Sequence, residues 1–177
     1  MFKIFALLVI LLFSYSSIAT SITPTELFST INLRLSYMED VALYKANNNK
    51  PIEDIVREAV VIEKASISAE KEGLDKQSVI DFFKSQISAA KAIQYRYRAD
   101  LLNEPTTSTP RNLNTVIRPR LIKLGKKINT ELAHYLQEGG TFSKKHLVLF
   151  KATLNSRYLT DTDKEALFKG LTQIQLQ

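Results

Sequence analysis

The sequence predicts an all-α protein, a single helical domain of about six helices that follows a cleaved signal peptide. Apolar residues recur at intervals of three and four along most of the chain, as on the buried face of an amphipathic helix. Residues that typically begin and end helices flank these segments, and no segment shows sustained alternation of apolar and polar residues. We therefore expect three long N-terminal helices, a fourth helix that packs on them, two shorter helices and no sheet.

The N-terminal segment has the layout of a secretory signal peptide. Lys3 precedes an unbroken apolar run over residues 4–13, and small residues flank an expected cleavage site after Ala19. The run is shorter than the roughly 20 apolar residues that span a bilayer. We predict a signal peptide over residues 1–19 and a helical domain over residues 20–177. The mature protein is then periplasmic or secreted, and not attached to the membrane.

The composition excludes several kinds of chemistry. The chain has no cysteine, so disulfides, thiol catalysis and cysteine-bound metals are excluded. His134 and His146 fall in separate predicted helices and do not support a zinc site or a catalytic triad. The net charge of +6 is spread along the chain rather than gathered in a basic stripe. We therefore expect no metal and no nucleic acid partner, whereas a small anionic ligand fits the positive excess.

The helix boundaries follow from capping residues and breakers. The first helix is expected to start at a capping box in residues 23–26 and to end near Lys45, before three asparagines. The second helix is expected to start at Pro51 and to stop at Gly73. A loop is expected over residues 103–112, which contain two prolines. The expected caps of the later helices are Asp75 for the third, Asn114 or Thr115 for the fourth, Ser143 for the fifth, and Thr160 or Thr162 for the sixth.

Two cations interrupt the apolar face of the first predicted helix. Arg34 and Lys45 are close to three full turns apart, so their side chains project in the same direction about 16 Å apart along the axis. One interpretation is that Arg34 flanks the core and Lys45 is a helix-end cation favoured by the helix dipole. The other interpretation is that both cations face a binding site.

Further polar residues lie where the other long helices are expected to pack. Gln94 is a lone amide on the apolar face of the third helix, where burial requires a hydrogen-bond partner. Asp54 and Arg57 have the spacing of an ordinary surface ion pair, and Arg118 falls in the first turn of the fourth helix. Because unmatched charges are very costly in a core, the whole set predicts a site for a small ligand with several negative charges.

Five segments carry a more specific signal, in a fixed order that covers most of the mature chain. They are LRLSYMEDVALYK (33–45), PIEDIVRE (51–58), EGLD (72–75), FFKSQISAAKAIQY (82–95) and VIRPRLIKLG (116–125). In this order and spacing the segments resemble the secreted, gamma-class chorismate mutases of the all-helical type.

The resemblance implies an isomerase that converts chorismate to prephenate in one concerted step, without a cofactor or a covalent intermediate. By position, Arg34, Arg57 and Arg118 are implied to hold the two substrate carboxylates. Lys45 and Gln94 are implied to donate hydrogen bonds to the ether oxygen of the breaking bond. Such groups accelerate the reaction by folding the substrate and by stabilising the charge that develops on the oxygen.

The resemblance also implies that Glu58 and the backbone near Asp54 meet the ring hydroxyl of the substrate. Ala90 departs from the family, because relatives often have at this position a serine or threonine that helps bind a carboxylate. The resemblance therefore implies that this contact is either absent, which would weaken substrate binding, or made by the backbone. A homodimer is implied as well, with each site assembled within one chain.

Two alternatives remain open at this point. A periplasmic helical binding or adaptor protein without catalysis would explain the export signal and the helices, but not the cations on apolar faces. Elimination of pyruvate from isochorismate, on the same fold, is the second alternative.

Overall fold

The computed structural model describes residues 22–177, so the predicted signal peptide and its cleavage site lie outside the described residues. These residues form seven α-helices and one π-helical turn, with a single β-bridge between Leu74 and Leu176 as their only β-pairing. The predicted all-α fold is therefore confirmed. None of the described helices has the length and hydrophobicity needed to cross a membrane. The helices are α1 (Pro24–Leu35), α2 (Met38–Asn47), α3 (Ile55–Lys71), α4 (Ile80–Asn103), η1 (Leu113–Ile117), α5 (Arg118–Gln137), α6 (Lys144–Thr153) and α7 (Asp161–Thr172).

The predicted first helix is divided into α1 and α2. Its capping box is present, since the Glu26 N–H donates to the Thr23 hydroxyl at 3.3 Å and the Thr23 N–H donates to the Glu26 carboxylate at 2.9 Å. A turn at Ser36 then ends α1, which corrects the prediction of one continuous helix. The Ser36 hydroxyl donates to the Leu33 carbonyl at 2.8 Å, a local bond that competes with continuation of the helix.

Helix α3 begins at Ile55, not at Pro51 as predicted. The cause is Asp54, whose carboxylate accepts a hydrogen bond from the Arg57 N–H at 3.0 Å and caps the helix. The helix ends as predicted before Gly73, which has a φ of +88°. The cap fixes the first turn of α3.

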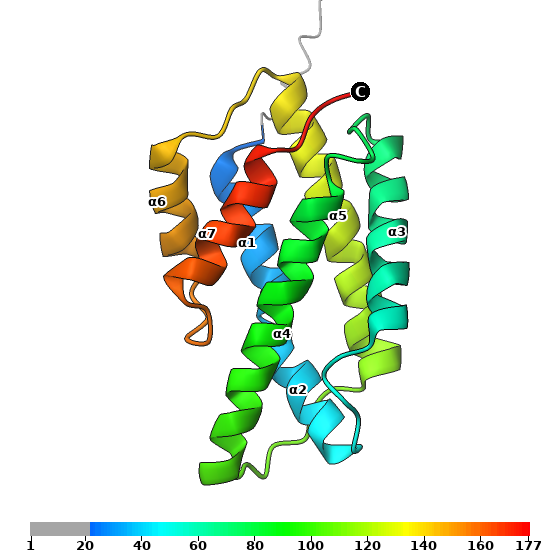
Figure 1. Cartoon of the computed structure of the whole chain (residues 1–177), viewed down its shortest axis with the longest axis vertical. Coiled ribbons are helices and arrows are strands. Elements are labelled where there is room, and N and C mark those ends of the chain that lie inside the picture. Colours follow the sequence, from blue (N-terminus) through cyan, green and yellow to red (C-terminus); the bar gives the residue numbers. More distant parts are fainter. Residues whose placement is uncertain (1–21) are drawn as a thin grey trace, which may run out of the picture.

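The N-terminal end of α3 is exposed to solvent, even though apolar residues occur there. Ile55 is 75% exposed, and within the helix only Ser66 and Ala69 are buried. Helix α3 contacts α4 and α5 with one side and leaves most of its surface open. In Figure 1 it forms the outermost helix on one side of the domain.

The starts of the third and fourth predicted helices also differ from the prediction. Asp75 caps a turn, in which its carboxylate accepts the Ser78 N–H at 2.6 Å, and α4 begins only at Ile80. Asn112, rather than Asn114 or Thr115, begins the fourth helix, because its side-chain oxygen accepts both of their N–H groups at 2.9 Å. The first five residues of this helix adopt the wider π form and lead directly into α5.

The last two helices pack behind α1 and α4. Ser143 and Thr160 cap α6 and α7 as predicted. Phe28 of α1 meets Phe150 of α6 edge to face, with 5.0 Å between ring centroids, and Phe168 of α7 completes the cluster. Figure 1 shows α6 and α7 on the side of the molecule opposite to α3. This core leaves the space between α1, α2, α3, α4 and α5 for the cavity described below.

Candidate active site

A cavity of about 430 Å³ lies where α1, α2, α3, α4 and α5 face one another. Its size is that of a small-molecule site. Every site residue predicted from the sequence lines it, including those that are far apart along the chain. They are Arg34, Lys45, Asp54, Arg57, Glu58, Gln94 and Arg118.

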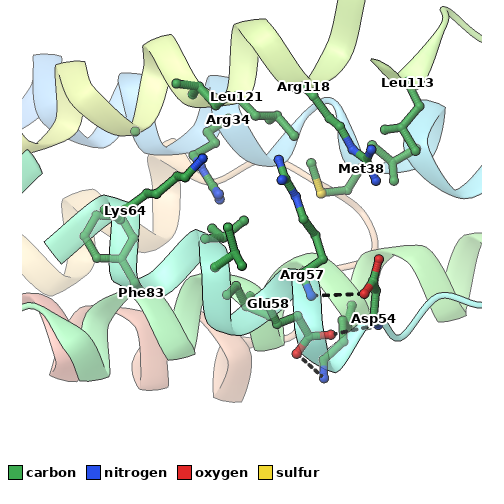
Figure 2. A pocket seen from close by; sticks show the side chains of 18 of the residues that line it. Arg34, Met38, Asp54, Arg57, Glu58, Lys64, Phe83, Leu113, Arg118 and Leu121 are labelled. Atoms are coloured by element: carbon green, nitrogen blue, oxygen red, sulfur yellow. Dashed lines mark hydrogen bonds and ion pairs between the residues drawn. The ribbon is translucent and has the colours of Figure 1, made fainter. Parts of the chain in front are cut away.

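Arg34 is a buried cation without an acidic partner. Its side chain extends from α1 into the cavity (Figure 2), and the residue is 7% exposed. Its Nη1 donates to the side-chain oxygen of Gln86 at 2.9 Å, whereas its Nε has no hydrogen-bond partner. Burial lowers the pKa of Arg34 to about 10. Arg34 is thus buried within the core rather than at its edge, and its charge faces a cavity in which no carboxylate of the described chain forms an ion pair with it.

Two further guanidinium groups reach the same space. Arg57 extends from the first turn of α3, and Arg118 extends from the opposite wall at the start of α5 (Figure 2). Asn114 holds Arg118, because its side-chain oxygen accepts a hydrogen bond from the guanidinium at 2.6 Å. The surface ion pair considered for Asp54 and Arg57 is absent, since Asp54 binds the backbone N–H of Arg57.

Lys45 and Gln94 lie on α2 and α4, which pack against each other. The Lys45 amine donates to the Ile52 carbonyl at 2.6 Å, and burial is the main cause that lowers its pKa below that of a free lysine. Gln94 is 5% exposed, and its amide nitrogen donates to the Ala90 carbonyl at 3.0 Å. An amide has two N–H donors, and the second one of Gln94 meets the Met38 sulfur at 3.8 Å. A thioether is a weak acceptor, so a ligand oxygen is the better partner for this N–H.

The acids of the cavity are already engaged at the start of α3. The Glu58 carboxylate accepts from the Lys91 amine at 3.1 Å and from the Asp54 N–H at 3.3 Å. The first of these bonds raises the pKa of Lys91. Glu58 and Asp54 therefore do not neutralise the three arginines, and the cavity keeps a positive excess.

Four residues of the site were not predicted from the sequence. Lys64, Lys91 and Lys126 also line the cavity, and Gln86 supports Arg34 from behind. Lys91 lies three residues before Gln94, so helical spacing alone places it on the same face. No comparable signal marks Lys64 and Lys126, which are exposed residues on the surfaces of their helices. The remaining walls are apolar and include Met38, Val41, Phe83, Leu113 and Leu121.

The arrangement is suited to bind and orient a compact polyanion. Cations and an amide converge from several helices on a space with apolar walls, where electrostatic interactions are stronger than in water. Residues 22–177 contain no group of three or more His, Cys, Asp or Glu side chains that could hold a metal ion. The fold and the cavity thus define a helical protein with a site that is suited to a small, multiply charged anion.

Comparisons with known proteins identify the family. The family model for chorismate mutase type II matches residues 25–95. The chain is 42% identical over 148 residues to a secreted chorismate mutase of Yersinia pestis, covering 83% of this chain and 79% of the relative. It is 34% identical over 163 residues to a monofunctional chorismate mutase of Enterobacter agglomerans, covering 92% and 90%. The crystal structure of the Yersinia pestis protein superposes with a TM-score of 0.80 at 40% identity, covering 86% of this chain and 98% of that one.

The chain belongs to the type II chorismate mutase family. The predicted resemblance is therefore confirmed. The predicted periplasmic or secreted location is confirmed by the relationship to the secreted Yersinia pestis protein. Cleavage after Ala19 stays a prediction.

Proposed function

We propose that the cavity is the active site in which the protein converts chorismate to prephenate. The observation that carries this proposal is Arg34, a buried guanidinium without an acidic partner at the wall of a cavity that matches a small molecule in size. Chorismate carries two carboxylates and needs several cations to leave water. Its rearrangement moves no proton, which fits a cavity whose described walls contain no histidine.

The three arginines are proposed to hold the two carboxylates. Arg34 and Arg118 enter from one side and Arg57 enters from the other, so the substrate is gripped between opposite walls (Figure 2). The planar guanidinium can bind a carboxylate with two parallel hydrogen bonds. Such a grip holds the flexible side chain of the substrate folded over its ring, which is the geometry that the reaction needs.

Lys45 and Gln94 are proposed to stabilise the ether oxygen as its bond breaks. Lys45 supplies a partly desolvated positive charge, and Gln94 supplies its second N–H. The bond from Gln94 to the Ala90 carbonyl fixes the direction of the amide before the substrate arrives. Donors that are already in place are worth far more at a developing charge than donors that must reorient.

The ring hydroxyl is proposed to bind at the start of α3. Glu58 offers a carboxylate acceptor, and the Asp54 N–H next to it is an exposed backbone donor that at present binds Glu58 at 3.3 Å. Lys91 holds the second oxygen of Glu58 and so fixes the carboxylate. The hydroxyl then meets an acceptor and a donor within one helix turn.

The test is to incubate the purified mature protein with chorismate and, separately, with isochorismate, and to identify the products by chromatography. Prephenate from chorismate supports the proposal. Pyruvate and salicylate from isochorismate, without prephenate from chorismate, would reassign the cavity to elimination. Binding of chorismate with no product would make the protein a binding module.

The predicted homodimer is part of the same proposal. All the proposed site residues come from one chain, so each protomer would carry a complete site. Sedimentation of the mature protein at several concentrations would test the oligomeric state. A monomer with full activity would refute the dimer and leave the site proposal intact.

A further inference from the structure

Gln86 lies behind Arg34 and outside the cavity wall. It is fully buried on α4, with 0% of its surface exposed. Its side-chain oxygen accepts the hydrogen bond from Arg34 Nη1 at 2.9 Å, and its side-chain nitrogen has no partner. A glutamine buried with half of its polar group unsatisfied costs stability, so it calls for a reason beyond packing.

The partner of a buried arginine is normally a carboxylate, which cancels its charge and satisfies several of its donors. Here the partner is a neutral amide. An amide oxygen fixes the direction of one guanidinium N–H but leaves the positive charge whole. Glutamate has nearly the same shape as glutamine, so the absence of a carboxylate at this position is a matter of charge and not of space.

No other described group neutralises Arg34. The charged residues that line the same cavity on α2, α3, α4 and α5 are cations, except for Glu58 and the capping Asp54. Glu58 is bound to Lys91, and Asp54 is bound to the backbone of α3. The cations are Lys45, Arg57, Lys64, Lys91, Arg118 and Lys126.

We propose that Gln86 is a positioning residue that aims the Arg34 guanidinium at the cavity while leaving its charge available for a substrate carboxylate. The inference rests on the proposed function of the cavity. Gln86 acts through Arg34 and does not touch the substrate. A carboxylate at this position would compete with the substrate for Arg34, and an apolar residue would free the guanidinium to rotate.

Two substitutions separate charge from geometry. Gln86→Glu keeps the shape and adds a carboxylate, whereas Gln86→Leu keeps a similar volume and removes the hydrogen bond. We expect kcat/KM to fall by at least about 10²-fold in Gln86→Glu, as for loss of one preorganised donor, and by about 10-fold in Gln86→Leu. The melting temperature should be higher for Gln86→Glu than for Gln86→Leu. The new carboxylate pairs with Arg34, whereas leucine leaves the Arg34 guanidinium without a hydrogen-bond partner. Gln173→Glu, at the exposed residue that follows the C-terminus of α7, controls for the change in net charge and should leave kcat/KM unchanged.

A purely structural Gln86 gives a different result. In that case the better-fitting Gln86→Glu would be the more active variant as well as the more stable one, and this order would overturn the inference. A combination with Arg34→Ala gives a second readout. If Gln86 acts through Arg34, then adding Gln86→Glu to Arg34→Ala causes little further loss of kcat/KM, whereas multiplied losses would overturn the inference.

Failure of the proposed function remains distinguishable from failure of this inference. Should the wild-type protein make no prephenate, the proposed function fails. The same variants are then compared by calorimetric titration with chorismate, which reports the grip of Arg34 directly. Weaker binding in Gln86→Glu than in Gln86→Leu supports the role of Gln86, and the reverse order overturns it. If Gln86→Leu does not fold, the comparison of Gln86→Glu with wild type and with Arg34→Ala decides.

Discussion

Replacement of Gln94 by glutamate tests the proposed stabilisation of the ether oxygen most directly. Gln94 is 5% exposed, and one of its two N–H groups is committed to the Ala90 carbonyl at 3.0 Å. An amide donates at every pH, whereas an ionised carboxylate only accepts hydrogen bonds. Gln94→Glu therefore replaces a donor by a negative charge at the point where negative charge develops.

The expected size of the effect combines two terms. Removal of one preorganised donor lowers kcat by about 10²- to 10³-fold. Two full charges about 4 Å apart interact by about 4 kcal/mol at an effective dielectric constant of about 20, so a half-developed charge raises the barrier by about 2 kcal/mol, or a factor of about 30. The ionised variant should thus lose about 3 × 10³- to 3 × 10⁴-fold in kcat/KM.

The pH dependence gives the sign of the effect. Burial and the nearby Ala90 carbonyl raise the pKa of the introduced carboxyl, whereas Lys45 and the arginines lower it. In either case the variant is impaired above that pKa and recovers as the pH falls through it. Recovery is partial, because a carboxylic acid has one proton for two acceptors, the Ala90 carbonyl and the ether oxygen.

The assay is kcat/KM for chorismate from about pH 5 to pH 8, a range in which the wild type should be nearly flat because the mechanism requires no titration there. Gln94→Leu has no donor at any pH and serves as the flat control. The glutamate variant should fall below the leucine variant at neutral pH and rise above it in acid. Equal, pH-independent activity of the glutamate variant and the wild type would remove Gln94 from the site.

Three further predictions concern the cations. Arg34→Ala should lower kcat/KM by at least about 10²-fold. The variant should still unfold cooperatively, because the substitution removes an unpaired buried charge. Normal kinetics together with a lower melting temperature would show that Arg34 has a structural role. Asn114→Ala should raise KM about tenfold, which corresponds to the free energy of the one hydrogen bond that holds Arg118. An unchanged KM in steady-state kinetics would refute this role of Asn114. At alkaline pH, kcat/KM should fall as Lys45 and Arg34 lose their protons, because burial lowers the pKa of both and that of Arg34 to about 10. Lys45→Arg should remove the contribution of Lys45 and leave that of Arg34, and a pH profile with the same shape as that of the wild type would exclude Lys45.

The residues of the site were predictable where a polar side chain interrupts an apolar face. Arg34 and Gln94 stand out because their helical neighbours are apolar, and both are buried at the cavity. Gln86 was not predicted because Ile87 is next to it in the sequence. Gln86 lies three residues after Phe83 and Ile87 lies four residues after it, and both spacings are compatible with the buried face of a helix. Nothing local in the sequence says which of the two points inward.

The helix boundaries were less predictable, because side-chain bonds decided them. The break at Ser36 has no proline or glycine to announce it. Asp54 and Asn112 start their helices by accepting backbone N–H groups, and each competed with neighbouring residues that cap helices equally well. The predicted faces of α1 and α4 are nevertheless correct, since Arg34 and Gln94 are buried at the cavity as their apolar neighbours indicate. The register between Arg34 and Lys45 was predicted for one continuous helix, and the turn at Ser36 interrupts it.

The positive charge of the cavity is needed for the proposed function but lowers the stability of the fold. Several cations that repel one another line the same cavity, and in the proposed function the substrate dianion would relieve this repulsion. Selection for a more robust fold would replace these residues with apolar ones, so their persistence is expected only while the reaction is needed. A lineage that no longer used the activity would be free to fill the cavity, and its descendants would be more stable proteins with nothing left to bind.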